Sequence, residues 1–506
     1  MQHRDSAKLI DLRAGKRQWL LESVLAGLLA ICGQLNDAWS AEATTPNLVF
    51  VFVDDMGYGD LGCFRDLGRA SPIDHGPSLT PNIDQLASEG LRLTQFYVAS
   101  PICSPSRVAI TTGQFPGRWL INSYLNNRAD NASRGMANWL DPQAPCIARE
   151  FQRAGYATAH FGKWHMGGGR DVGEAPLPTE YGFDESLVSF EGLGDRILPP
   201  GGLSEQSAKL GRGNIQRVKK HEQTAIYVDR CIDFMERNRE HKFYLHLWLN
   251  DVHDGHVPAP GEAEKFADRT QNPNERKFFA VLSDMDWQLG RLFAKLTDLG
   301  LDEKTLVCLT SDNGPTAWPN YYKSGNDPAG STAGFRGRKW SLYEGGIRMP
   351  FIARWKGRIA ANQIDRTHVL GSVDLLPTFL ACAGLPATAV NGDGGDASTI
   401  LLAKPEQRSS ILTSRPALFW EYGRDDTYLK PGLPDDQSPN LAIRDGQWKL
   451  LVNADGSRTE LYAVGTEGEI DEHKNVAEAY PEVTSRLKTR LLEWRQSLPA
   501  LTQSGN

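Results

Sequence analysis

Positive charge is in short supply in this sequence. Lysine and arginine together number 55 against 62 aspartate and glutamate residues, which gives a formal net charge of −7 over 506 residues. Beyond the first 20 residues, the chain has no dense run of basic side chains of the kind that follows a phosphate backbone. We therefore expect no nucleic acid among its partners.

A hydrophobic run long enough to span a bilayer is also absent. The apolar stretch near the N-terminus, Ser23 to Asn36, has 14 uncharged residues, whereas a spanning helix needs roughly 20. Basic residues precede it and Ala38-Trp39-Ser40 follows it, which is typical of a secretory signal peptide over residues 1–40. We expect export to the periplasm or the medium, with no stable membrane insertion after cleavage. An uncleaved anchor and lipidation at Cys32 are the alternatives, and the bulky Ile31 disfavours the second.

Cysteine is scarce and scattered, with seven residues in the whole chain. An exported protein can hold disulfides, but this spacing predicts no disulfide framework. Cys308 in LVCLT and Cys382 in FLACAG fit small buried hydrophobes. Cys103 differs because it lies in PICSPSRVAITTG, among serines, prolines and an arginine. It could be a buried thiol, half of a disulfide or a reacting group.

Strand and helix patterns alternate from Asn47 onward. Apolar runs such as LVFVFV, FYLHLWL and TLVCLT are typical of parallel strands covered on both faces. Helical segments lie between them, including one that opens at Thr80-Pro81 and a long one over residues 275–299. The alternation predicts an α/β domain over residues 41–400, with a large mixed, mostly parallel sheet sandwiched by helices.

The pattern changes after the glycine-rich segment VNGDGGD. Short strands are predicted at ALFWEY, LAIRDGQWKLLVN and TELYAV, and a charged amphipathic helix follows over residues 480–497. We expect a smaller C-terminal α+β subdomain over residues 401–506, made of an antiparallel sheet plus a helix.

Polar residues follow each of the main predicted strands. They are Asp54-Asp55, Gly162-Lys163-Trp164-His165, the segment from Asn250 to His256, and Ser311-Asp312-Asn313-Gly314. Ligands of open parallel sheets bind at the carboxyl ends of the strands, so these groups should meet at one edge. Adjacent carboxylates repel one another unless a cation lies between them, and oxygen donors suit Ca²⁺ or Mg²⁺. The hard oxygen donors Asp54, Asp55, Asp312 and Asn313 therefore predict a divalent metal site, with ordinary Asp-Asn-Gly turns as the alternative.

Cys103 lies directly before a predicted helix. Pro105 falls near the first turn of that helix, which runs through RVAITTG. The positive end of the helix dipole favours an anionic ligand or a lowered thiol pKa. Arg107, one turn further in, could grip a tetrahedral oxyanion or anchor the site. The residues alone predict a metal site, a cationic pocket and a reactive group, without deciding the chemistry.

Several motifs resemble one family, the type I (formylglycine-dependent) sulfatases of the alkaline phosphatase superfamily. Cys103-Ser104-Pro105-Ser106-Arg107 matches the C-x-P-S-R signature of the family. PNLVFVFVDDMGYGDLGC, GKWH, SDNGP, RKWSLYEGGIRMP and IRDGQWKLL…ELY resemble its further motifs in the same order. Within the family, the chain resembles arylsulfatase and N-acetylgalactosamine-6-sulfatase-like enzymes. The resemblance covers most of the chain and implies an alkaline phosphatase-like fold with a catalytic domain and a C-terminal subdomain.

The resemblance implies a role for each matching residue. A formylglycine-generating maturation enzyme would oxidise Cys103 to 3-oxoalanine (formylglycine), and one hydroxyl of the aldehyde hydrate would attack sulfur. The alcohol would leave, and the second hydroxyl would then expel sulfate. The divalent cation, with Ca²⁺ preferred and Mg²⁺ as the alternative, would be held by Asp54, Asp55, Asp312, Asn313 and residue 103.

The remaining roles fall on basic side chains. By resemblance, Arg107 and His165 would hold the hydrate, and Lys163 and Lys339 would grip the sulfate oxygens. His256, which precedes Val257-Pro258, fits the catalytic histidine of the family better than His253 does. His253 then remains a candidate substrate contact.

The substrate expected from the resemblance is a sulfated carbohydrate. Sugars are usually held by carboxylates and hydrogen-bond donors, so Arg170, Asp171 and the acidic residues near Glu191 are further candidate contacts. The acidic net charge would repel a polyanion at long range, which favours a pocket for a terminal sugar. The alternatives are an arylsulfatase acting on small aryl esters, a phosphoester or phosphonate hydrolase on the same fold, and a non-enzymatic glycan-binding protein. No oligomeric state is predicted.

Overall fold

The computed structural model describes residues 45–68, 76–323, 325, 327–386, 391–411, 415–423, 428–465 and 471–500. The signal peptide expected over residues 1–40 lies outside them. Within the described residues, no helix combines the length and the apolar character needed to cross a membrane. The residues from Pro46 onward form one compact unit, and the domain limits at residues 40 and 400 remain predictions.

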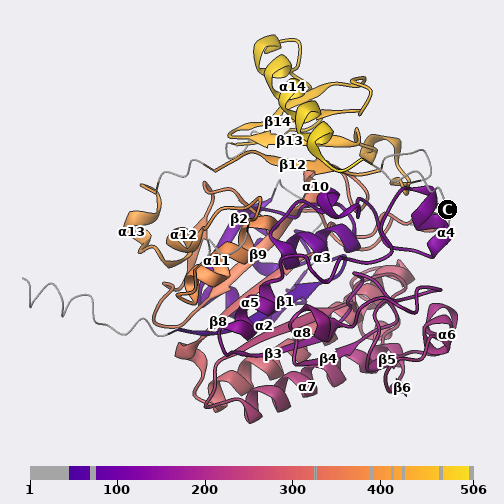
Figure 1. Cartoon of the computed structure of the whole chain (residues 1–506), viewed down its shortest axis with the longest axis vertical. Helices are drawn as coiled ribbons and strands as arrows, with labels where there is room; N and C mark the ends of the chain where they lie inside the picture. Colours follow the sequence, from indigo (N-terminus) through magenta and orange to yellow (C-terminus); the bar gives the residue numbers. More distant parts are fainter. Residues whose placement is uncertain are drawn as a thin grey trace, which may run out of the picture. The chain divides into compact units, whose positions relative to one another are not determined.

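A large sheet runs through the middle of this unit (Figure 1). Its strand order is β10 (Gln363–Asp365), β2 (Leu91–Tyr97), β9 (Arg348–Arg354), β8 (Thr305–Ser311), β1 (Asn47–Val53), β7 (Phe243–Leu249), β3 (Ala157–Gly162), β4 (Glu185–Val188), β5 (Arg196–Leu198) and β6 (Ile215–Arg217), while β11 (Leu370–Gly371) also pairs with β2. The β9 strand is antiparallel to both of its neighbours, and the other pairs in the sheet are parallel.

Helices cover both faces of the sheet because its central strands are apolar on both sides. In β1, Leu48, Phe50 and Phe52 face one core and the three intervening valines face the other. The first core is closed by α3 (Cys103–Thr112), α5 (Ile147–Arg153) and α11 (Leu375–Cys382), and the second by α2 (Pro81–Ser88), α7 (Gln223–Arg237) and α8 (Pro273–Asp298). The predicted class, a mostly parallel sheet sandwiched by helices, is confirmed.

Shorter helices lie in the connections. They are α4 (Arg128–Ser133), α6 (Gly202–Lys209), α9 (Pro319–Lys323), α10 (Glu344–Ile347), α12 (Ser398–Leu402) and α13 (Pro405–Arg408). The local sequence explains where several helices begin. Asn272 caps α8 by accepting hydrogen bonds from the backbone N–H groups of Asn274 and Glu275, and proline opens both α2 and α8.

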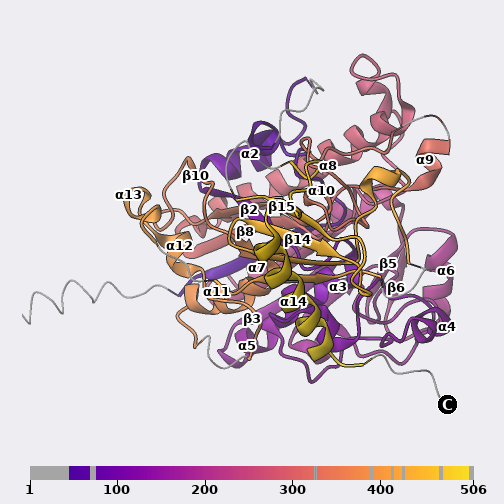
Figure 2. The same cartoon turned by 90° about the horizontal axis from the view of Figure 1, so that it is seen from above.

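The expected C-terminal sheet is also present. The antiparallel strands β12 (Leu418–Glu421), β13 (Leu441–Asp445), β14 (Trp448–Val452) and β15 (Glu460–Ala463) pair in sequence order. One face packs against α14 (Pro481–Ser497), which lies across the strands in Figure 2. The other face contributes Trp420, Ala442 and Leu451 to the first core of the large sheet. The small sheet is thus a layer between α14 and the rest of the fold.

Candidate active site

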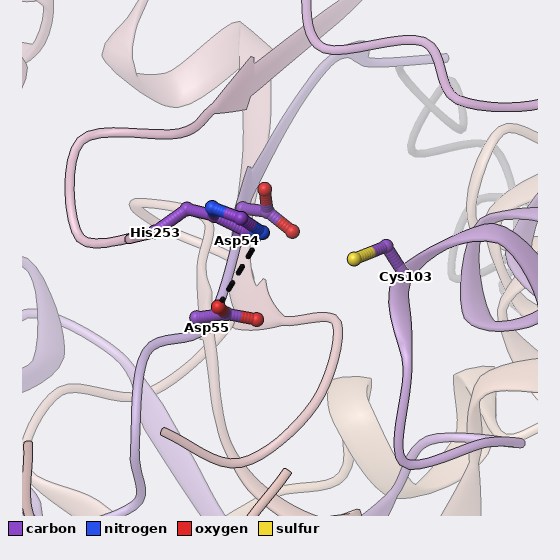
Figure 3. Close-up of side chains that lie close together, drawn as sticks. All are labelled: Asp54, Asp55, Cys103 and His253. Atoms are coloured by element: carbon purple, nitrogen blue, oxygen red, sulfur yellow. Dashed lines mark ion pairs between the residues drawn. The ribbon is translucent and has the colours of Figure 1, made fainter. Parts of the chain in front are cut away.

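Four neighbouring parallel strands, β8, β1, β7 and β3, end at the same edge of the large sheet, as expected from the sequence. Asp54 and Asp55 follow β1, Asp312 and Asn313 follow β8, and Lys163 follows β3. The N-terminus of α3 faces them with Cys103. In Figure 3 the Cys103 sulfur points toward Asp54 and Asp55, while His253 lies beside Asp55. Ligand atoms from these four side chains lie within 4.8 Å of one another.

The acidic groups are interlinked and buried. The backbone N–H of Asp55 donates to Asp312 Oδ1 at 3.0 Å, and Asn313 Nδ2 donates to Asp55 Oδ1 at 2.7 Å. Burial and the nearby Asp54 raise the pKa of Asp312 well above its ordinary value. Burial also acts to raise the pKa of Asp54, but Lys163, His253 and Arg107 hold it well below its ordinary value. The crowding of these carboxyl groups therefore opposes the ionisation of Asp312, and a cation between them would relieve the repulsion.

Two buried oxygens of this cluster accept no hydrogen bond from any described residue, namely Asp54 Oδ1 and Asn313 Oδ1. Arg107 NH2 lies 3.1 Å from Asp54 Oδ1 without making a hydrogen bond to it. A buried acceptor without a partner is costly, and a cation satisfies such an oxygen directly. The donor set is dominated by carboxylate and amide oxygens, which fits Ca²⁺ or Mg²⁺.

Two lysines offset the negative charge of Asp54 and Asp55. Lys163 Nζ lies 2.7 Å from Asp54 Oδ2, and Lys339 Nζ lies 2.7 Å from both oxygens of Asp55. Although burial acts to lower their pKa values, these carboxylates raise the pKa of both lysines above the ordinary value. Both ammonium groups therefore remain charged inside the site.

Arg107 lies beneath the cluster and is fully buried. It donates from NH1 to the Lys163 carbonyl and from NH2 to Asp312 Oδ2, each at 2.8 Å. Its guanidinium carbon is 5.1 Å from the centre of the Trp248 ring, a cation–π contact. Arg107 thus anchors two strand ends, which is one of the two roles open to it from the sequence.

Cys103 is the first residue of α3 and is buried, with its sulfur 3.5 Å from Lys163 Nζ. The helix dipole favours a lowered thiol pKa, but the structure gives the opposite direction. Burial and the negative charge of Asp54 raise the pKa of Cys103 despite the two nearby lysines. An unmodified thiol here stays protonated, and it is a weak nucleophile.

Glu191 joins the site although the sequence suggested it only as a sugar contact. Its Oε2 lies 3.0 Å from His165 Nδ1 and 3.4 Å from Lys163 Nζ. Burial acts to raise the pKa of Glu191, but His165, Lys163 and Arg170 lower it to about 2. Burial lowers the pKa of His165 to about 3, against the opposing effect of Glu191. Treating the segment before Glu191 as one more strand of the sheet (β4) would have revealed its place at this edge.

Of the two candidate histidines, His253 lies beside the acidic cluster and lines the cleft. His253 Nε2 is 3.2 Å from Lys339 Nζ and 3.7 Å from Asp55 Oδ2. His256 is turned away, because its Nε2 bonds to the Val252 carbonyl at 3.0 Å and its ring packs edge-on against Phe278. His256 thus holds its own loop in this structure, and its catalytic role stays a prediction.

A cleft of about 1050 Å³ opens above the cluster. Its lining includes Asp54, Cys103, Lys163, His165, Arg170, Glu191, His253, Lys339, Trp318 and Tyr321. The candidate sugar contact Arg170 therefore lines the cleft, where its NH2 lies 3.7 Å from Glu191 Oε1. Asp171 does not line the cleft. It is exposed and accepts a hydrogen bond from the Arg128 backbone N–H at 3.0 Å.

This geometry is that of an enzyme site for a tetrahedral anionic group. It combines buried oxygen donors, cations that offset their charge and a residue at the start of a helix, and an open cleft lies above them.

The family model described as Sulfatase matches residues 46–385. Human arylsulfatase A is 32% identical over 441 residues, covering 82% of this chain and 76% of that protein. An N-acetylgalactosamine-6-O-sulfatase of Bacteroides thetaiotaomicron is 26% identical over 524 residues, covering 88% and 92%. The chain belongs to the sulfatase family and is a sulfuric ester hydrolase.

Solved structures agree on the fold. The crystal structure of Ps i-CgsB in complex with k-i-k-neocarrahexaose superposes with a TM-score of 0.69 at 22% identity, covering 90% of this chain and 94% of that one. The phosphonate monoester hydrolase of Agrobacterium radiobacter superposes with a TM-score of 0.57 at 19% identity, covering 90% and 96%. Because this fold also carries a phosphonate hydrolase, the fold alone does not select the ester.

Proposed function

We propose that this protein is an exported sulfatase that removes sulfate from sulfated carbohydrates, using a formylglycine made from Cys103 and one divalent cation. The observation that carries the proposal is the meeting of Cys103 with two buried oxygens that accept no hydrogen bond from a described residue, on Asp54 and Asn313, and two charged lysines. The family typically uses such a metal and such a modified cysteine. Export rests on the N-terminal sequence pattern alone.

The residues that would hold the cation are Asp54, Asp55, Asp312, Asn313 and the modified side chain at position 103. Bound there, the cation would polarise the sulfate oxygens and the nucleophilic hydroxyl. We favour Ca²⁺ over Mg²⁺, because Ca²⁺ tolerates irregular oxygen cages while Mg²⁺ demands a near-ideal octahedron.

Conversion of Cys103 to formylglycine would replace a weakly nucleophilic thiol by a better nucleophile. The buried thiol has a raised pKa and is a poor nucleophile, whereas a hydrated aldehyde offers a hydroxyl in the same place. His165 lies beside this position with its Nε2 3.2 Å from the Leu125 carbonyl oxygen and its Nδ1 3.0 Å from Glu191 Oε2, and we assign it to fixing this side of the nucleophile's pocket. Arg107 fixes the position of Asp312 and of the chain at Lys163 from below.

Sulfate recognition falls to Lys163 and Lys339, whose ammonium groups reach the cleft. Lys339 and His253 lie within hydrogen-bond distance of each other, and we assign this pair to the bridging oxygen of the ester. As the S–O bond breaks, its electron pair stays on that oxygen, and one proton passes to it from the pair. The leaving alcohol is thereby released neutral.

The carbohydrate substrate is supported by the names of relatives, including N-acetylgalactosamine-6-sulfatases. The cleft adds a cationic contact at Arg170 and an aromatic wall at Trp318 and Tyr321, a combination suited to an anionic sugar. We expect terminal sugars to be favoured, as the acidic surface disfavours long polyanions.

The test is hydrolysis of three ester classes by correctly matured enzyme: sulfated mono- and disaccharides, an aryl sulfate and an aryl phosphonate. We expect the highest kcat/KM on a sulfated sugar. Preference for the aryl sulfate with no sugar accepted would replace the substrate class by small aryl esters. Turnover of the phosphonate alone would contradict the sulfatase assignment.

A further inference from the structure

The loop that presents His253 is held by a lysine from the segment that precedes α7. Lys220 Nζ donates to the carbonyl oxygens of His253 at 3.0 Å and of Gly255 at 2.6 Å. The ring of His253 is fixed as well, since its Nδ1 lies 2.7 Å from the Asp254 carbonyl oxygen. This contact leaves Nε2 directed at Lys339.

The side chain of Asp254 ties the same loop to a second strand end. Its carboxylate accepts hydrogen bonds from the Tyr321 hydroxyl, at 2.5 Å, and from Thr316 Oγ1. Thr316 lies three residues after Asn313, on the segment that leaves β8. The connection therefore fixes His253 relative to the chain that carries Asp312 and Asn313. None of these three residues is assigned above to the metal, the nucleophile or sulfate, although Asp254 and Tyr321 line the cleft and Tyr321 belongs to its aromatic wall.

We propose that Asp254, through Tyr321 and Thr316, is a positioning residue that keeps His253 paired with Lys339 beside the leaving oxygen. The proposal rests on the proposed function, in which that pair releases the alcohol. A carboxylate with two hydroxyl donors is a directional anchor, and reacting groups displaced by about 1 Å lose as much as 10²-fold in rate.

The positioning role predicts a dependence of the rate on the leaving group, which a general structural role does not. A sugar alcohol is a poor leaving group and needs a proton as the S–O bond breaks, whereas a nitrophenolate leaves without one. Loosening the Asp254 anchor should therefore slow sugar sulfates much more than 4-nitrophenyl sulfate. A general loss of active-site order would slow both esters equally.

The experiment compares kcat and KM on the best sulfated sugar and on 4-nitrophenyl sulfate for Asp254→Asn, Tyr321→Phe and His253→Ala. For the first two variants we expect kcat on the sugar ester to fall about 10-fold to 100-fold, with less than about 3-fold loss on the aryl ester and little change in KM. Tyr321→Phe removes a single oxygen, so it keeps the test valid if Asp254→Asn misfolds. Asp229→Asn and Tyr480→Phe make the same chemical changes at exposed positions and should behave as the unmodified enzyme.

Equal losses on both esters, or no loss, in Asp254→Asn and Tyr321→Phe would overturn the positioning role. So would a rise in KM for the sugar ester at unchanged kcat, which is the result expected if the two side chains only contact the sugar. His253→Ala separates this failure from failure of the proposed function. If His253→Ala slows the sugar ester more than the aryl ester while Asp254→Asn and Tyr321→Phe slow both equally or not at all, only the positioning role is wrong. If His253→Ala slows both esters equally, the proton-donating pair itself is wrong.

Discussion

At the scale of single residues, replacing Lys339 tests whether the cationic side chains of the site bind sulfate. Its ammonium group lies 2.7 Å from both oxygens of Asp55 and faces the cleft. Lys339→Met keeps the length of the side chain and removes the charge, so we expect kcat/KM to fall about 10²-fold to 10³-fold, as when one preorganised donor is lost. Lys356→Met, at a partly exposed lysine outside the cleft, is the control. Steady-state kinetics on the same ester would contradict the assignment if both variants kept full activity.

The oxygen cluster predicts dependence on a divalent metal. Chelation should abolish activity and lower the melting temperature, and Ca²⁺ should restore both, since a ligand at 100 times its Kd stabilises the fold by about 2.7 kcal/mol. Asn313→Leu removes a partnerless oxygen and should weaken the metal-dependent shift in melting temperature, whereas Asp229→Asn should not. A melting temperature that changes neither with chelator nor with Ca²⁺ would contradict the proposed metal site.

Sequence reasoning located the groups that directly follow a strand. Asp54, Asp55, Asp312, Asn313 and Lys163 could be predicted because the chain has no freedom between a parallel strand end and the next residue or two. His253, Glu191 and Asp171 could not be placed in this way, because each lies on a longer loop whose course depends on distant partners. Tyr321 and Lys220, which hold the His253 loop, come from segments that no local pattern connects to it.

At the scale of elements, a buried charge cluster joins α10 and β14. Lys449 Nζ lies 2.9 Å from both Glu344 Oε1 and Glu472 Oε1, and all three side chains are buried. Burial and the neighbouring Glu344 raise the pKa of Glu472 to about 7, against the effect of Lys449. Burial opposes the effect of Lys449 and Arg348 on Glu344, but these cations lower its pKa to about 2.

These two shifts make opposite contributions to stability as pH changes. The raised pKa of Glu472 stabilises the fold fully below about pH 4.5, and this contribution is lost as pH rises toward 7. The lowered pKa of Glu344 stabilises the fold above about pH 4.5 and is lost as pH falls toward 2. Glu472→Gln should therefore flatten the decline in unfolding free energy between about pH 5 and pH 7. Denaturant unfolding at several pH values checks this, and an unchanged slope would contradict it.

Element types were easier to predict than strand direction. The apolar runs of β1, β7 and β8 predict buried strands, and their helical connections predict parallel pairing. The β9 strand is fully buried as well, but it is antiparallel to β2 and β8. A strand covered on both faces has the same apolar pattern in either direction, so its sequence could not reveal this. The short strands β5 and β6 also lack enough residues to establish a period.

At the scale of the whole molecule, the C-terminal region should not be separable from the rest. Trp420 donates from Nε1 to the Val98 carbonyl at 2.7 Å, and one face of its sheet completes the first core. Deleting residues 401–506 would expose that core to water, so we expect an insoluble or unfolded product. Limited proteolysis of the full chain should likewise give no stable fragment that ends near residue 400. A soluble, cooperatively folded product of 41–400 would contradict this expectation.

The most direct test of the central claim pairs the chemical state of residue 103 with sulfate release. The protein would be produced with graded amounts of a formylglycine-generating enzyme, and mass spectrometry of the peptide around residue 103 would give the converted fraction. We expect sulfate release to rise in proportion to this fraction and to be zero at zero conversion. Cys103→Ala should be inactive but folded. Full activity in protein whose residue 103 is still an alkylatable thiol would contradict it.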